Sequence, residues 1–180
     1  MALKTGGVRL DQAMCSIART TAVVGDRWVP LILRDVYFGL DRFDQLQEDL
    51  RVASNVLSSR LDHLVDNEML ERVAYQEHPP RYCYRLTERA TDFIPVLLSL
   101  MAWGDRWLAP EGPPVLLEHR DAEGEGHVLQ PEVYCASCGE RVTAEGLAAK
   151  PGPGMPDDEV RAHFAERFAR ARPPGGSPSA

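Results

Sequence analysis

Two short polar segments carry the side chains best suited to bind another macromolecule. The first, residues 53–64, combines small polar residues with leucines at helical spacing. The second, residues 78–85, has the sequence His-Pro-Pro-Arg-Tyr-Cys-Tyr-Arg. Serine and asparagine can hydrogen-bond to base edges, and arginine binds phosphate groups or guanine. A short helix followed by a two-stranded ribbon with an arginine at its tip is typical of a winged helix-turn-helix, so we expect both segments to bind DNA.

The first segment predicts a recognition helix. Ser54 is its expected N-cap, and leucines at i, i+4 and i+7 form an inward face. Asn55 and two serines lie on the outer side of the first turns, the end that enters a major groove, and asparagine can form two hydrogen bonds with adenine. For Asp62 and Asp66 a solvated surface is favoured. With flanking positions included, the predicted DNA contacts are Arg42, Ser54, Asn55, Ser58, Ser59, Arg60, His63, Arg81 and Arg85.

The second segment predicts the tip of a hairpin. Residues 71–76 and 82–86 alternate in polarity as strands do, which places Arg81, Cys83 and Arg85 on one side of the ribbon. Two prolines stiffen the tip, so less entropy is lost when Arg81 is placed in a minor groove or on a phosphate. A solvated tip is the alternative.

Helical periodicity predicts four further helices, at about residues 11–24, 27–38, 41–50 and 87–108, with Asp26, Asp41 and Thr87 as caps. The last helix has more apolar perimeter than one contact face needs, so part of it is expected to meet a second chain. A homodimer follows, with one recognition helix on each half of a palindromic operator. The predicted dimer interface or effector pocket for a small molecule is formed by Trp28, Phe93, Leu97, Met101 and Trp103, and an ordinary packed core is the alternative.

The charge distribution allows DNA binding only through a local basic face. The formal net charge is -7, which argues against a general nucleic-acid coat. Residues 1–110 hold 13 basic and 15 acidic side chains, and residues 111–180 hold 7 and 12, so most of the acidic excess lies in the tail. A protein-interaction module that has lost DNA binding is therefore the alternative function.

The remaining sequence features exclude other classes. We find no Gly-x-Ser-x-Gly, phosphate loop or His-Glu-x-x-His motif, so no enzyme is expected. Neither a membrane-spanning apolar run nor a secretory signal is present, so we expect no membrane partner and a cytoplasmic protein. The predicted architecture is mainly helical (α+β): a winged helix-turn-helix and dimerisation domain over 1–110, a small β-rich extension over 111–154, and an amphipathic helix with a disordered end over 155–180.

Several ordered motifs between residues 8 and 110 resemble the HxlR-type bacterial transcriptional regulators, which are relatives of the MarR regulators. The matching motifs are Cys15, Gly25–Trp28, Arg42–Leu46, Ser54–Leu64, Leu70–Arg72, Pro79–Arg81, Tyr84–Thr87 and Trp103–Gly104. The resemblance implies a homodimeric winged helix that binds operator DNA near promoters, as a repressor in the favoured interpretation, with the terminal helices forming the dimer.

The resemblance also implies a role for Cys15, because some members of that family sense electrophiles or oxidants through the cysteine at this position. Such a thiol must be exposed and have a lowered pKa, to which Arg19, one helical turn later, is placed to contribute. The alternative is a structural thiol, because free cysteines are among the most buried residues. Cys83 carries no sign of reactivity.

The tail contains one Cys-x-x-Cys pair, Cys135 and Cys138, at a turn that resembles half of a zinc ribbon. Structural zinc takes four ligands, and His119 and His127 are the only nearby candidates. Long members of the family often carry a cysteine within residues 121–127, and this chain has none. We therefore predict no cofactor and favour a metal-free hairpin, with zinc and a redox dithiol as the alternatives.

Overall fold

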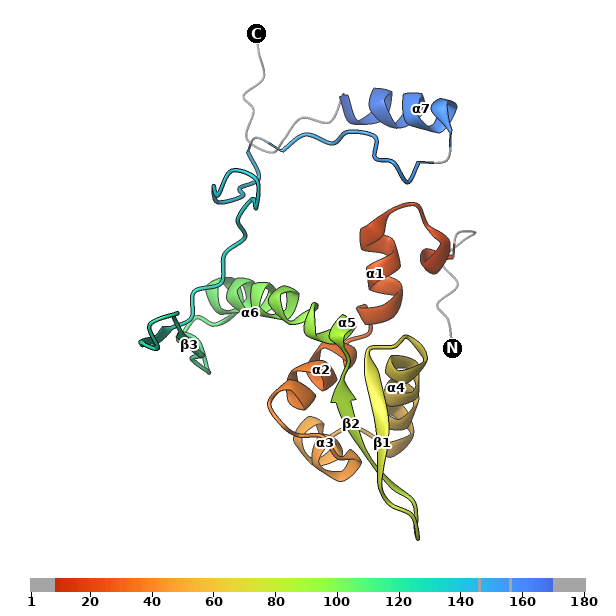
Figure 1. The fold of residues 1–180 in the computed structure, drawn as a ribbon, viewed down its shortest axis with the longest axis vertical. Helices are drawn as coiled ribbons and strands as arrows, with labels where there is room; N and C mark the ends of the chain where they lie inside the picture. The colour runs from red at the N-terminus through yellow and green to blue at the C-terminus, as the bar shows by residue number, and fades with distance from the viewer. Residues whose placement is uncertain (1–8, 146, 156, 170–180) are drawn as a thin grey trace. The chain divides into compact units, whose positions relative to one another are not determined.

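The structure is a computed structural model that describes residues 9–145, 147–155 and 157–169. The chain divides into two compact units, residues 1–131 and 132–180. The first unit contains, in chain order, η1 (Leu10–Gln12), α1 (Ser16–Val24), α2 (Val29–Tyr37), α3 (Phe43–Leu50), α4 (Ser54–Asp66), β1 (Leu70–Gln76), β2 (Arg81–Leu86), α5 (Glu88–Thr91), α6 (Ile94–Leu108), β3 (Glu118–Arg120) and β4 (Gly126–Val128) (Figure 1). The second contains α7 (Asp158–Ala169). The predicted mainly helical fold with a two-stranded wing is confirmed, while the predicted division into three segments stays a prediction.

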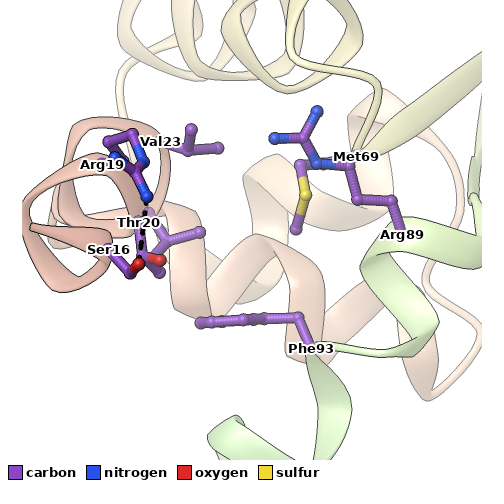
Figure 2. Close-up of a pocket in the computed structure, with 8 residues that line it drawn as sticks. Ser16, Arg19, Thr20, Val23, Met69, Arg89 and Phe93 are labelled. Carbon is purple, nitrogen blue, oxygen red and sulfur yellow. Dashed lines mark hydrogen bonds between the residues drawn. The ribbon is translucent and has the colours of Figure 1, made fainter. Parts of the chain in front are cut away.

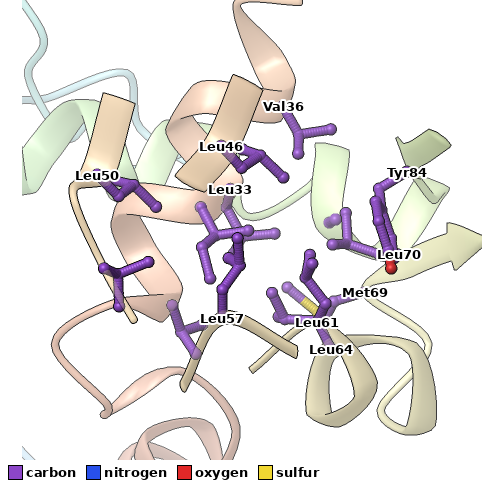
Figure 3. Close-up of a cluster of buried hydrophobic side chains, with 14 residues drawn as sticks. Leu33, Val36, Leu46, Leu50, Leu57, Leu61, Leu64, Met69, Leu70 and Tyr84 are labelled. Carbon is purple, nitrogen blue, oxygen red and sulfur yellow. The ribbon is translucent and has the colours of Figure 1, made fainter. Parts of the chain in front are cut away.

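The core of the first unit lies between α2, α3 and α4 (Figure 3). Leu57, Leu61 and Leu64 of α4 are fully buried against side chains such as Leu33 of α2 and Leu46 of α3. Each buried leucine stabilises the fold by roughly 1.5–3 kcal/mol relative to an exposed one. This packing fixes the inward face of α4, so its opposite face is presented to solvent.

The turn between α3 and α4 consists of residues 51–53. Arg51 adopts a left-handed conformation, with φ of 48°, and ends α3. The α4 helix begins at Ser54 itself, and the extended residue before it occupies the cap position without a side-chain hydrogen bond. The prediction of Ser54 as the N-cap is therefore wrong: the chain enters helical geometry one residue early, and the Ser54 hydroxyl is exposed.

The hairpin of β1 and β2 is antiparallel, and its register runs from Leu70 opposite Leu86 to Gln76 opposite Arg81. Residues 41 and 42 extend the sheet on the other side of β2. The Tyr84 amide donates to the Asp41 carbonyl at 2.7 Å. Asp41 is not the cap of α3 that the sequence suggests, because α3 begins at Phe43 and Arg42 occupies the N-cap position. The side-chain oxygen of Gln45 instead accepts a hydrogen bond from the Arg42 amide at 3.1 Å.

The short bridge to β2 also explains why Cys83 is buried. Arg42 pairs with Cys83 across an isolated antiparallel bridge, so the extended chain covers this side of the strand. The Cys83 thiol lies 3.6 Å from the Val73 carbonyl oxygen, to which it donates. Cys83 alternates with Arg81 and Arg85 along β2, as the sequence predicts, but it is buried while both arginines are exposed.

Both long terminal helices of the prediction are interrupted. Residues 13–15 separate η1 from α1, and the Arg19 guanidinium donates to the Ala13 carbonyl at 2.8 Å and to the Ser16 hydroxyl at 3.0 Å. The predicted helix over 87–108 divides into α5 and α6 because Pro95 has no N–H to continue the hydrogen-bond ladder. Thr87 caps α5 as predicted: its hydroxyl accepts a hydrogen bond from the Ala90 amide at 3.2 Å.

The tail forms two short separate hairpins where the sequence suggests one small sheet. In the first unit β3 pairs with β4, with His119 opposite His127. In the second unit an isolated bridge joins Tyr134 to Arg141 around the Cys-x-x-Cys turn, in which Gly139 adopts a φ of 74°. A helix is present at α7. The sequence predicts it to be amphipathic through Val160, Phe164 and Phe168; Val160 is half-buried, while the side chains of the two phenylalanines and the expected disordered end lie outside what the structure describes.

Candidate nucleic-acid interface

The first two turns of α4 present short polar side chains to solvent. Asn55, Ser58 and Ser59 are exposed, as is Ser54 at the start of the helix. Asn55 and Ser59 lie opposite the buried leucines and Ser58 lies on the flank, as the helical rotation predicts. Short side chains let a helix approach base edges closely, and an asparagine amide supplies both a donor and an acceptor there. This end of α4 is therefore sterically and chemically suited to a major groove.

Arg60, by contrast, is held within the protein. Its Nη2 lies 2.8 Å from Oδ2 of Asp26, with 30% and 31% of the two side chains exposed. The other carboxylate oxygen of Asp26 accepts a hydrogen bond from the Trp28 amide at 2.9 Å in the turn before α2. Since α2 begins at Val29 with Trp28 as its N-cap, the prediction of Asp26 as the cap is wrong. Burial acts to raise the pKa of Asp26, but the hydrogen bonds from Arg60 and from the Trp28 amide, with the positive charges of Arg60 and Arg27, outweigh it and hold that pKa below its ordinary value. The pair connects α4 to the start of α2.

His63 is likewise engaged internally. Its Nε2 lies 2.8 Å from the carbonyl oxygen of Val23, near the end of α1. Because a carbonyl only accepts, this nitrogen carries the proton. The Asn67 side-chain amide donates to the His63 carbonyl at 2.8 Å. The second half of α4 is thus connected to α1.

The wing extends past the helices as a narrow hairpin (Figure 1). Arg81 at its tip and Arg85 further along β2 are exposed. Their participation in DNA binding, like that of the other predicted contacts, stays a prediction.

Stacked arginine–tyrosine pairs brace the wing. The Arg42 guanidinium carbon lies 4.8 Å from the ring centroid of Tyr75, and that of Arg72 lies 4.8 Å from the ring centroid of Tyr82. Arg72 also approaches Asp62 of α4, at 3.7 Å. Neither pair is among the sequence predictions, although arginine and tyrosine at cross-strand positions are a signal that could have indicated the second of them.

The predicted dimer and effector residues do not form one exposed set. Trp28, Phe93, Leu97 and Met101 are half-buried, and only Trp103 is exposed, at 57%. Four exposed apolar side chains of α6 recur on one helical face, and a fifth, Leu108, lies apart from it. On α1 the exposed apolar side chain is Ile17, which is 75% exposed. The face on α6 consists of Val96, Leu100, Trp103 and Trp107.

A cavity of about 370 Å³ lies between α1 and the segment that follows α4 (Figure 2). Of the predicted effector residues only Phe93 lines it. The sequence analysis missed the other lining residues, which are Ser16, Arg19, Thr20, Val23, Val24, Met69 and Arg89. Helical spacing along α1 could have indicated a shared face, but not what lies opposite it.

The thiols differ in exposure. Cys15 is exposed at the N-cap position of α1, so the expectation of a buried structural thiol there is wrong. Cys135 is half-buried and Cys138 is exposed. Hydrogen bonds from the backbone N–H groups of Cys138 and Ser137 hold the pKa of Cys135 below its ordinary value.

His119 Nδ1 and His127 Nε2 lie 3.3 Å apart across the β3–β4 hairpin. Within residues 9–145, 147–155 and 157–169, no group of three or more histidine, cysteine, aspartate or glutamate side chains is placed to hold a metal ion. Over the same described part of the chain, no helix has the length and apolar character needed to cross a membrane.

Comparison with known proteins gives consistent matches. The family model described as HxlR-like helix-turn-helix matches residues 23–112. An uncharacterized HTH-type transcriptional regulator of Mycobacterium tuberculosis is 43% identical over 141 residues, which cover 78% of this chain and 87% of that protein. The crystal structure of PA1607, described as a candidate transcription factor, is 33% identical with a TM-score of 0.69, over 79% of this chain and 98% of that chain. PA1374 of Pseudomonas aeruginosa, described in the same way, is 38% identical with a TM-score of 0.57, over 83% and 99%.

Proposed function

The chain belongs to the HxlR-like helix-turn-helix family of transcriptional regulators, and we propose that it is a repressor that binds a palindromic operator as a homodimer. One observation carries the proposal: the two halves of α4 differ. Its first half presents short exposed polar side chains, Asn55, Ser58 and Ser59, while Arg60 and His63 in its second half are bonded to α2 and α1. Such a helix is free where it enters a groove and anchored where it does not.

This asymmetry assigns different roles to the predicted contacts. Asn55, Ser58 and Ser59 contact base edges. Arg60 and His63 act as positioning residues, since Arg60 Nη2 and His63 Nε2 each lie 2.8 Å from a partner within the chain. An anchored helix enters the groove with its orientation already set, so less entropy is lost on binding.

The wing supplies the phosphate contacts. Arg81 and Arg85 are exposed on β2, and Arg42 is exposed where it stacks on Tyr75. Phosphate contacts fix the register of a protein on DNA but carry no sequence information directly. The arginines of this unit thus provide the local positive face that an acidic chain needs.

The exposed apolar face of α6 is the dimer surface. Trp103 and Trp107 are 57% and 63% exposed, and Ile17 of α1 adds a further apolar side chain. Contiguous apolar surface of this kind marks an interaction site on a protein. A two-fold dimer places two recognition helices about 34 Å apart, which is one turn of DNA.

Cys15 is the thiol through which oxidation acts. It is exposed at the beginning of α1, and α1 is connected to the recognition helix through Val23 and His63. Hydrogen peroxide oxidises a thiol to a sulfenic acid and is itself reduced to water. Oxidised Cys15 disturbs α1 and so the spacing of the two recognition helices, which lowers operator affinity.

The test is a gel-shift titration with DNA that flanks the protein's own gene, at two salt concentrations, with wild type, Asn55→Ala and the control Gln130→Ala, which changes an exposed amide remote from α4. Wild-type affinity should fall steeply with salt. Asn55→Ala should lose about 1–3 kcal/mol of operator binding and relax base preference, while Gln130→Ala should bind as wild type does.

Salt-independent or absent binding by wild type would instead favour an interaction module without DNA binding, which the net charge of -7 would suit. Because promoter DNA lies in the bacterial cytoplasm, the proposed function also places the protein there.

A further inference from the structure

We propose that the cavity between α1 and the segment after α4 binds a small organic carboxylate with a hydrocarbon body, and that this ligand weakens operator binding. The effect of the ligand on operator binding rests on the proposed function. The cavity of about 370 Å³ lies within the size range of small-molecule sites. Figure 2 shows its walls, with Val23 and Arg19 from α1 on one side and Met69, Arg89 and Phe93 on the other.

The lining chemistry selects this class of ligand. Val23, Val24, Met69 and Phe93 provide apolar surface, and none of the lining residues is acidic. Two guanidinium groups, those of Arg19 and Arg89, are the charged groups of the lining. A guanidinium binds a carboxylate through paired hydrogen bonds, while the apolar side chains favour a hydrocarbon body. A neutral hydrocarbon or a bare anion would satisfy only one half of the site.

The existing partners of the two arginines leave them able to bind an anion. Arg19 donates to a neutral carbonyl and a neutral hydroxyl, those of Ala13 and Ser16. Arg89 lies 3.7 Å from Glu68, a side chain that is 83% exposed. An exposed ion pair at this distance contributes little, about 0–1 kcal/mol. A ligand carboxylate competes with weak interactions only.

The cavity is also separate from the proposed dimer surface. None of its lining residues belongs to the exposed apolar face of α6, and Ile17, the exposed apolar residue of α1, does not line it. The side chains proposed for the dimer surface are therefore not the side chains that would bind the ligand.

Two walls of the cavity are bonded to the recognition helix. Val23 lines the cavity with its side chain, while its carbonyl accepts from His63 of α4 at 2.8 Å. Met69 lies opposite, and its amide donates to the Leu64 carbonyl at 2.8 Å. A ligand that changes the separation of these walls changes the position of α4 relative to α1. Binding and operator affinity are then coupled, and the coupling is reciprocal.

The binding test uses 2-naphthoate as probe, with neutral 2-naphthamide and acetate as the two half-matched compounds. Calorimetry on the full chain without DNA should show 2-naphthoate binding at least about tenfold more tightly than either, because only it meets both halves of the site. Arg19→Gln/Arg89→Gln should reduce its affinity by at least about tenfold. Arg120→Gln, which removes another exposed arginine paired with a glutamate, is the matched control and should bind as wild type does.

Thr20→Trp provides an independent variant, because it fills the cavity from an exposed position without removing a charge. It should abolish 2-naphthoate binding while circular dichroism shows an unchanged helix content. If 2-naphthamide binds as well as 2-naphthoate, or if the double glutamine variant binds 2-naphthoate as wild type does, the site is not an anion site and the inference is overturned.

The regulatory clause is tested by repeating the operator titration with saturating 2-naphthoate, which should raise the operator Kd by about 5- to 150-fold, the usual range of such coupling. No change in Kd with the ligand bound overturns that clause. Operator binding without 2-naphthoate binding refutes this inference alone, whereas 2-naphthoate binding without operator binding refutes the proposed function.

Discussion

The division of α4 into a free half and an anchored half can be tested at Arg60. Sequence alone predicts a DNA contact for this arginine, whereas the structure pairs it with Asp26 at 2.8 Å. Arg60→Met keeps the aliphatic stem and removes the charge. Asp26→Asn keeps the oxygen that accepts from the Trp28 amide and removes the partner charge. Together with the double variant they form a double-mutant cycle, which isolates the pairwise interaction.

The expected coupling energy follows from the exposure of the pair. Exposed ion pairs contribute about 0.2–1 kcal/mol, and hydrogen bonds to charged groups about 1.5–3 kcal/mol. With 30% and 31% of the side chains exposed, we expect about 1–2 kcal/mol at neutral pH, between these limits. Since the folded pKa of Asp26 is lowered, this stability is present above the unfolded pKa of about 3.9 and is lost as the pH falls through the lower folded value.

Two measurements decide the question. Urea unfolding of the four proteins gives the coupling energy, and gel shifts at several salt concentrations give the slope of log affinity against log salt. A positioning role leaves the slope of Arg60→Met equal to that of wild type, whereas loss of a phosphate contact lowers it by about 0.9. A coupling energy below about 0.3 kcal/mol, together with a lowered salt slope, would show that Arg60 binds DNA and does not act as a positioning residue.

Four further predictions test the remaining parts of the fold and interface. Arg81→Ala should weaken binding to all DNA sequences about equally and lower the salt slope by about 0.9, measured by gel shift on operator and random DNA. An unchanged slope would show that the wing tip does not contact a phosphate. Trp103→Glu should convert the dimer to a monomer in sedimentation, because it places a charge in the apolar face, and a wild-type monomer at micromolar concentration would contradict the dimer. Leu61→Ala should lower the free energy of unfolding by about 2–5 kcal/mol in urea, since the side chain is fully buried. Cys15→Ser should keep operator binding after peroxide treatment that inactivates wild type and the Cys135→Ser/Cys138→Ser variant; equal loss in all three would exclude Cys15 as the sensor.

Local patterns were sufficient to predict the parts of the fold that depend on neighbouring residues. The spacing of Leu57, Leu61 and Leu64 predicts the buried face of α4, because helical geometry alone determines which side chains share a face. The alternation of residues 82–86 and the prolines before them likewise predict the wing. The break before α6 was also visible in the sequence at Pro95, but the apolar run around it was interpreted as one helix.

Contacts between distant residues account for most of what the sequence could not predict. His63 meets a carbonyl 40 residues earlier in the chain, and no local pattern indicates such a partner. Cys83 alternates with exposed arginines, yet residues 41–42 cover it. The cavity has the same origin, because its walls come from α1, from Met69 and from Arg89 and Phe93. Amphipathic spacing shows that a residue is covered or exposed, but not which segment covers it.

Each of two tyrosines in the wing has an arginine over its ring. The guanidinium carbons of Arg42 and Arg72 lie 4.8 Å from the ring centroids of Tyr75 and Tyr82, and a planar guanidinium can stack on such a ring. Lysine has no plane to stack in this way, so exchange of either arginine for lysine would keep the charge and lose its placement. Under the proposed function, Tyr75 acts on DNA binding through Arg42 without itself contacting a nucleotide, so a substitution at Tyr75 would change the affinity for DNA while every proposed DNA-contacting residue stays the same.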